Sequence, residues 1–187
     1  MKLKQGLVQV YTGDGKGKTT ASLGLTWRAI GRGLKVCYVQ FMKGRIKSGE
    51  QLSTELFGDL LTFAQISANS HGQGRKSKPG SPWWTQPLSD ADRAYAQQGV
   101  AFAHQAVTSG EYDMVVCDEI NVVCDMGLIS VEDILSLIKD KLPEVELVLT
   151  GRNVKPEVVE AADLVTEMKL IKHPFQKRIP ARRGIEF

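Results

Sequence analysis

The chain has 187 residues and is 42% hydrophobic, long enough for one buried core and too short for two separate domains. Its net charge of +3, from 24 Lys and Arg against 21 Asp and Glu, does not by itself favour a nucleic-acid partner over a small anion. The start of the chain lacks the long apolar stretch of a signal peptide, and no segment reaches the roughly 20 apolar residues of a membrane span. We therefore expect a single cytoplasmic domain over residues 1–187, with no membrane partner.

The first predicted elements surround a glycine-rich loop. An apolar run at 7–11 predicts a strand, and a helical pattern extends from Lys18 to about residue 32. Between them, residues 12–20 read Thr-Gly-Asp-Gly-Lys-Gly-Lys-Thr-Thr. Glycines let the backbone N–H groups turn towards a phosphate, Lys18 can reach its oxygens, and the Thr19 hydroxyl can bind Mg²⁺. This order of strand, loop and helix predicts a P-loop that binds ATP.

The spacing within this loop is unusual. Only Asp14, Gly15 and Lys16 separate Gly13 from Gly17, whereas the usual motif has one more residue between these glycines. Either Thr12 takes the place of the first glycine, or the loop is one residue short.

Further apolar runs of strand length suit strands that are buried on both faces, and they lie at residues 36–41, 114–117, 145–149 and 164–168. The three cysteines are odd in number and form no Cys-x-x-Cys motif, which favours buried free thiols: Cys37, Cys117 and Cys124.

Helical patterns separate these runs. The patterns at 89–108 and 130–142 each open with a serine followed three residues later by an aspartate, which predicts two capping boxes. The second carries one apolar stripe that is typical of core packing, formed by Val131, Ile134, Leu135, Ile138 and Leu142. The alternation of strands and helices predicts an α/β fold of the P-loop NTPase type, with a mostly parallel sheet flanked by helices on both faces.

Two stretches break the pattern. Residues 67–87 are rich in Ser, Gly, Lys and Pro and contain Trp83 and Trp84, and this variable loop is either a lid or a disordered insertion. In an extended segment adjacent side chains face opposite ways, so one tryptophan can pack inside while the other meets a flat ligand. Residues 172–187 form a basic tail without clear periodicity.

Two carboxylates follow the strand at 114–117. Asp118 and Glu119 are expected at its carboxyl end, beside the phosphate loop, where they could hold Mg²⁺ directly or through water. Glu119 could instead polarise a water for hydrolysis. The remaining alternative is that both residues cap the next helix.

Two arginines could neutralise a triphosphate. Arg152, in Thr-Gly-Arg, ends a strand at the same edge of the sheet. Arg28 lies in the helix after the loop, although helical arginines are often simply solvated.

The chain, from about Leu7 to its last residue, resembles the P-loop family of ATP:cob(I)alamin adenosyltransferases, the corrinoid adenosyltransferases of vitamin B12 assimilation and cobalamin biosynthesis. The motifs that carry the resemblance are Gly-Asp-Gly-Lys-Gly-Lys-Thr-Thr at 13–20, Val-Gln-Phe-Met-Lys-Gly at 39–44 with Gly-Glu at 49–50, Trp-x-Thr-Gln at 83–86, Cys-Asp-Glu-Ile at 117–120, Thr-Gly-Arg at 150–152, Lys-His-Pro-Phe at 172–175 and the closing Gly-Ile-Glu-Phe.

The resemblance implies an alkyl transfer, in which a cobalt(I) corrinoid attacks the 5′ carbon of ATP and expels triphosphate. The shortened loop then holds ATP in the reverse of the usual direction. Lys18 and a Mg²⁺ on Thr19 and Glu119 stabilise the leaving group, with Lys18 and Glu119 as the catalytic residues. The matching ATP-binding positions are Gly13, Asp14, Gly15, Lys16, Gly17, Lys18, Thr19, Thr20, Arg28 and Arg152.

The same resemblance implies an aromatic pair against the lower face of the corrin. Trp83 matches one member, Ser81 stands at the position of the other, and Trp84 is the candidate to substitute. It also implies a flavoprotein reductant and a homodimer.

Two other functions share a P-loop. A nucleotide kinase would need a phosphoryl acceptor facing the γ-phosphate, and the short loop argues against this. A nucleic-acid-stimulated ATPase would use Lys76, Lys78 and the basic tail, but these charges are few, and no nucleic-acid partner is expected.

Overall fold

The computed structural model describes residues 3–42, 48–66 and 88–186. The variable loop at 67–87, with Trp83 and Trp84, lies outside the described residues, so the corrinoid-facing assignment stays a prediction.

A six-stranded sheet in the order β3-β2-β4-β5-β1-β6 forms the centre of the fold. Every neighbouring pair is parallel, which confirms the predicted α/β class. The strands are β1 (Val8–Thr12), β2 (Val36–Phe41), β3 (Leu61–Ile66), β4 (Met114–Asp118), β5 (Glu146–Thr150) and β6 (Leu164–Glu167).

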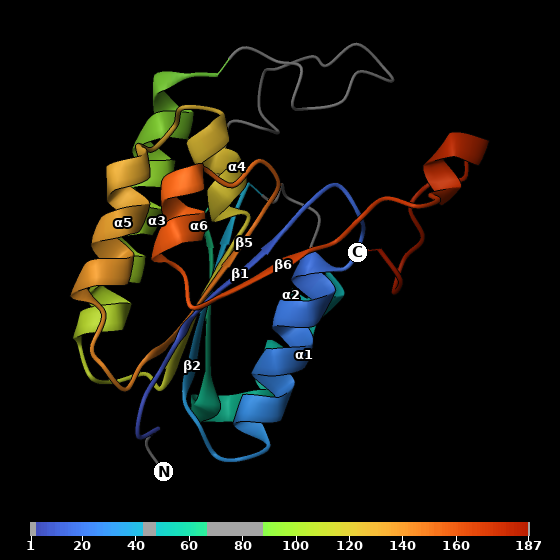
Figure 1. The fold of residues 1–187 in the computed structure, drawn as a ribbon. Coiled ribbons are helices and arrows are strands. Elements are labelled where there is room, and N and C mark those ends of the chain that lie inside the picture. The colour runs from blue at the N-terminus through green and yellow to red at the C-terminus, as the bar shows by residue number, and fades with distance from the viewer. Residues whose placement is uncertain (1–2, 43–47, 67–87, 187) are drawn as a thin grey trace.

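Helices cover both faces of the sheet (Figure 1). One face carries α1 (Lys18–Ile30), and the other carries α3 (Asp90–Thr108), α4 (Ile120–Asp125), α5 (Val131–Asp140) and α6 (Pro156–Ala161). The shorter elements are α2 (Gly49–Leu52) and two 3-10 helices, η1 (Thr54–Leu60) and η4 (Pro174–Lys177). In the described part of the chain, none of the helices has the length and apolar character that crossing a membrane requires.

Both capping boxes are confirmed. The Ser89 hydroxyl accepts from the Asp92 N–H while the Asp92 carboxylate accepts from the Ser89 N–H, and Ser130 and Asp133 repeat the arrangement. Helix α5 ends at Asp140, two residues before the predicted Leu142, because Lys141 is already extended at ψ 142°.

The core lies on both faces of β2 and β4, all of whose residues are buried. The predicted stripe packs into this core: Ile134 is fully buried, and Val131, Leu135, Ile138 and Leu142 are partly buried against it. Leu137, which the predicted stripe did not include, is fully buried as well. The three cysteines are free and buried, as predicted. The expectation that the run at 164–168 is buried on both faces was wrong: β6 is an edge strand whose four residues are all exposed.

Candidate functional site

The glycine-rich loop lies at the carboxyl end of β1. Thr12 pairs with Glu167 as the last residue of β1, and α1 begins at Lys18, so the loop comprises residues 13–17. Thr12 is therefore part of the sheet, and of the two alternatives the structure supports the loop that is one residue short. Gly13 and Gly17 have φ values of 91° and 126°, a region that residues with a Cβ rarely adopt.

The segment after β6 crosses directly against this loop. The Gly15 N–H donates to the Met168 carbonyl at 2.7 Å. A Cβ on either Gly13 or Gly15 would lie 2.6 Å from the Met168 oxygen. The close approach of two backbones thus explains the glycines at these positions.

The Lys18 side chain, at the start of α1, reaches back to the loop. Lys18 is 7% exposed, and its Nζ donates to the carbonyl oxygens of Gly13 at 2.6 Å and Gly15 at 2.8 Å. Burial lowers the Lys18 pKa, and the negative charge of Glu119 partly opposes that shift. The structure therefore places the predicted phosphate-binding cation at the loop, with Glu119 close enough to act on its charge.

Asp118 ends β4 and is fully buried. Its carboxylate accepts hydrogen bonds from the Thr19 hydroxyl at 3.0 Å, the Thr150 hydroxyl at 2.7 Å and the Gln40 amide at 3.2 Å. The first turn of α1 and the ends of β2, β4 and β5 thus meet at one carboxylate. The Asp118 carboxylate thus contacts the Thr19 hydroxyl directly.

Glu119 follows in the left-handed conformation, with φ 66° and ψ 18°, at the N-cap position of α4. Its backbone N–H donates to the Thr150 hydroxyl at 2.9 Å. Within the described part of the chain, the Glu119 side chain makes no capping hydrogen bond to α4, and the Asp118 carboxylate is held by the contacts above. The capping alternative therefore does not explain either carboxylate.

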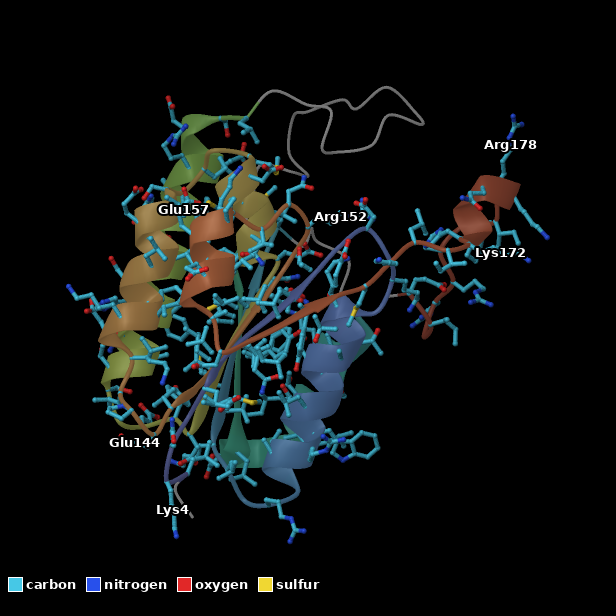
Figure 2. All side chains as sticks on the ribbon, in the orientation of Figure 1. Lys4, Glu144, Arg152, Glu157, Lys172 and Arg178 are labelled. Atoms are coloured by element: carbon cyan, nitrogen blue, oxygen red, sulfur yellow. The ribbon has the colours of Figure 1, made fainter. Side chains whose placement is uncertain are left out.

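The two arginines differ in position. Arg152 lies beside the loop, with Nη2 3.4 Å from the Asp14 carbonyl and Nε 3.9 Å from its carboxylate, and it is half exposed (Figure 2). Arg28 is exposed in the last turn of α1. The ten residues that separate it from Lys18 correspond to about 15 Å along the helix. The structure thus brings Arg152, and not Arg28, to the loop.

The oxygen atoms at this edge suit Mg²⁺. Thr19, Asp118 and Glu119 offer hydroxyl and carboxylate oxygens, the ligand type that this ion prefers. The described residues contain no group of three or more His, Cys, Asp or Glu that could hold a metal by themselves. Mg²⁺ is usually bound by one or two carboxylates together with waters and substrate phosphates, and the oxygen atoms of Thr19, Asp118 and Glu119 fit that pattern. The Gln40 amide donates to Asp118 through its nitrogen, while its buried Oε1 has no hydrogen-bond partner among the described residues. This oxygen could accept a hydrogen bond from a metal-bound water.

Two of these residues escaped the sequence reasoning. Gln40 is a polar residue inside a fully buried strand. A polar residue within an apolar run is the sequence signal that could have identified it. Thr150 lies in the Thr-Gly-Arg motif, and its position next to Arg152 at the end of a strand is the signal that could have identified it.

The parallel sheet, the glycine-rich loop that opens α1 and the buried aspartate against Thr19 define a P-loop nucleotide-binding protein. Residues 4–187 match the family model described as "ATP:corrinoid adenosyltransferase BtuR/CobO/CobP". The chain belongs to this family, which confirms the resemblance read from its motifs.

Similar proteins agree with this assignment. A corrinoid adenosyltransferase of Sinorhizobium sp is 38% identical over 186 residues, covering 98% of this chain and 81% of that protein. One of Pseudomonas aeruginosa is 34% identical, covering 98% and 85% of the two chains. Among solved structures, a KaiC-like protein from Pyrococcus horikoshii has a TM-score of 0.53 at 16% identity, covering 90% of this chain and 75% of that one, and supports the fold alone. The chain is thus an ATP-dependent corrinoid adenosyltransferase, and the kinase and ATPase alternatives are not favoured.

Proposed function

We propose that the chain transfers the 5′-deoxyadenosyl group of ATP to the cobalt of a reduced corrinoid, cob(I)alamin or cobinamide, and releases inorganic triphosphate. The observation that carries this proposal is the shortened loop, closed around Lys18 and packed against Met168, in a chain of this family. In the reaction the cobalt(I) substrate supplies the electron pair of the new Co–C bond. The bond between the 5′ carbon and its oxygen breaks, and its electron pair leaves with the triphosphate.

The chain's own work is to bind and neutralise the departing polyanion. The backbone of residues 13–20 and the Lys18 ammonium would hold the phosphates, and Arg152, beside the loop, would add positive charge there. Arg28 is exposed in the last turn of α1, so any contribution from it would come from further away. No side-chain nucleophile is needed, because cobalt(I) is itself the nucleophile.

Mg²⁺ is the proposed cofactor, held by Thr19 with Glu119 and the buried Asp118 as the nearby carboxylates. When bound, the ion would neutralise negative charge on the triphosphate. Glu119 and Lys18 are the proposed catalytic residues, and the effect of Glu119 on the Lys18 pKa supports their proximity.

The proposal extends to the partners of the enzyme. Trp83 and Trp84 would face the corrin, a flavoprotein would supply the reducing electrons, and the enzyme would act in the cytoplasm as a homodimer. The exposed edge strand β6, with Leu164 and Val165 about 40% exposed, supports an association with a second copy.

The test is an anaerobic mixture of the protein with ATP, Mg²⁺ and chemically reduced cob(I)alamin, followed by the absorbance change to adenosylcobalamin. The Lys18→Ala variant should lose at least about 100-fold in rate, because it removes preorganised charge at the leaving group. Lys139→Ala, at a solvent-exposed position of α5, is the matched control and should keep the wild-type rate. Orthophosphate release without adenosylcobalamin would contradict the proposal.

A further inference from the structure

We propose that Thr150 is a positioning residue of the adenosyl-transfer site, whose hydroxyl fixes the Asp118 carboxylate and the Glu119 backbone in one arrangement. The inference rests on the proposed function for its catalytic meaning. The arrangement itself is a property of the described residues.

The position of Thr150 in the sheet makes this double contact possible. Thr150 is the last residue of β5, fully buried, and β5 lies between β4 and β1. Its Oγ1 donates to Asp118 Oδ1 at 2.7 Å and accepts from the Glu119 N–H at 2.9 Å. One hydroxyl thus serves as donor to the first carboxylate residue and as acceptor from the second.

The contact with Asp118 determines how that carboxylate meets Thr19. Oδ1 accepts from both Thr150 and Thr19, and Oδ2 accepts from the Gln40 amide at 3.2 Å. Without the Thr150 hydroxyl, the carboxylate would lose its shortest hydrogen bond and could rotate away from Thr19. Groups that orient a metal-site carboxylate in this way contribute strongly to metal affinity.

The contact with Glu119 restrains the backbone at the point where the chain leaves β4. Glu119 has a left-handed backbone, which is disfavoured for a residue with a Cβ and has to be held by its surroundings. The hydrogen bond to Thr150 provides such a restraint. It therefore helps to direct the Glu119 side chain, whose charge acts on Lys18.

Gly151 allows the end of β5, and with it Thr150, to pack closely against the start of α4. A Cβ on Gly151, at φ 131°, would lie 2.9 Å from the Val122 nitrogen and 3.0 Å from the Asn121 Cβ. The end of β5 therefore packs directly against the first turn of α4, and Thr150 has little freedom to draw back from Asp118 and Glu119.

The experiment compares three variants. Thr150→Val keeps the shape and removes both hydrogen bonds, whereas Thr150→Ser keeps both. Thr26→Val is the matched control, because Thr26 is also buried but its hydroxyl donates to the Ser22 carbonyl within α1. Mn²⁺ binding in the presence of ATP is measured by electron paramagnetic resonance, and kcat and KM for ATP are measured with cob(I)alamin under saturating Mg²⁺.

Thr150→Val should weaken Mn²⁺ binding about tenfold or more and lower kcat by more than it raises KM for ATP, as expected for a group that orients a metal-site ligand. Thr150→Ser and Thr26→Val should stay within about threefold of wild type on the same comparison. Wild-type Mn²⁺ affinity in a folded Thr150→Val protein would overturn the inference, whatever its activity. If Thr150→Val does not fold, Thr150→Ala replaces it with the same expectations. A wild-type protein that binds Mn²⁺ with ATP but forms no adenosylcobalamin would contradict the proposed function, and the binding comparison would still test Thr150.

Discussion

The Gly15 N–H donates to the Met168 carbonyl at 2.7 Å, and this contact joins the phosphate loop to the segment that leaves β6. The Met168 N–H in turn donates to the Thr12 carbonyl at 2.8 Å, immediately before the loop. The Met168 backbone is thus hydrogen-bonded both to the end of β1 and to the loop that follows it. A loop that is one residue short is supported here by the residue that follows the edge strand β6, since Met168 lies 153 residues after Gly15 in the sequence.

Replacement of Gly15 by alanine should disrupt nucleotide binding. The added Cβ would lie 2.6 Å from the Met168 oxygen and 2.7 Å from the Lys169 oxygen, and both atoms belong to the backbone. Either the loop or the end of β6 must move, so we expect the affinity for ATP to fall by about tenfold or more, a loss of about 1.4 kcal/mol. Isothermal titration calorimetry with ATP and Mg²⁺ measures this.

Gly24→Ala is the matched control for Gly15→Ala. Gly24 lies within α1, and a Cβ there would meet nothing within 4 Å among the described residues outside the neighbouring helix backbone. This variant should bind ATP normally and gain about 0.5–1 kcal/mol of stability from the better helix propensity of alanine. Equal ATP affinity in the two variants would show that the contact with Met168 does not shape the loop.

Gly99→Ala should destabilise the protein despite lying in a helix. A Cβ on Gly99 would lie 2.5 Å from Phe41 Cε1 and 3.0 Å from Ile66 Cγ2, where α3 packs on the sheet. Overpacking costs roughly 1–3 kcal/mol, and the helix propensity of alanine returns about 0.5–1 kcal/mol. We therefore expect a net loss of up to about 2.5 kcal/mol in the free energy of unfolding, measured by urea denaturation. Phe41→Leu in the same chain should relieve part of that loss, and a stabilised single variant would contradict the packing described.

Much of the fold was predictable because its signals are local. The continuous apolar runs that became β2 and β4 are buried on both faces, and the two capping boxes mark where α3 and α5 begin. Strand β3 was not predicted, and its six residues are all only partly buried. Helix α4 was missed as well, since its six residues are too few for a periodic pattern.

In the candidate site, too, local motifs were predictable and long-range contacts were not. The phosphate loop and the acidic end of β4 could be predicted, because each is a contiguous motif. The contact between Thr150 and Asp118 could not, since it requires β5 to lie next to β4, and the contact with Met168 requires β6 to lie next to β1. The order of strands in a sheet depends on long-range contacts, and no local motif specifies it. Arg28 illustrates the opposite case, because the rise of a helix already separates it from Lys18 by about 15 Å.

The carboxylate of Glu186 should titrate at an unusually low pH. Arg182 donates to it from both its guanidinium and its backbone N–H, which lowers the Glu186 pKa to about 2. Because the pKa is depressed in the folded state, the stability that this pair contributes is present above the ordinary value of 4.5 and is lost as the pH falls towards about 2. NMR titration of the glutamate side-chain carbons measures the pKa directly.

Arg182→Met is the variant that tests this assignment. It should raise the Glu186 pKa towards its ordinary value by removing the guanidinium, while the backbone N–H of residue 182 still donates to the carboxylate. Lys16→Met should raise the pKa less, because the charge of Lys16 is the smaller influence. A Glu186 pKa near 4.5 in the wild-type protein would contradict the hydrogen bonds between Arg182 and Glu186.

Cys37 and Cys117 should be unreactive in the folded protein. Both are fully buried in adjacent strands, and burial raises the Cys37 pKa to about 12 and the Cys117 pKa further still. The thiolate is the reactive form, so a disulfide reagent such as Ellman's reagent at pH 8 should not modify either residue in a Cys124→Ala background, whereas both should react after denaturation. Because burial raises the Cys37 pKa in the folded state, deprotonation of this thiol destabilises the folded protein. The stability contributed by the buried neutral thiol is complete below its ordinary pKa of about 9 and is lost as the pH rises towards 12. Stoichiometric modification of the native Cys124→Ala protein, at the rate of the denatured chain, would contradict the packing of β2 against β4.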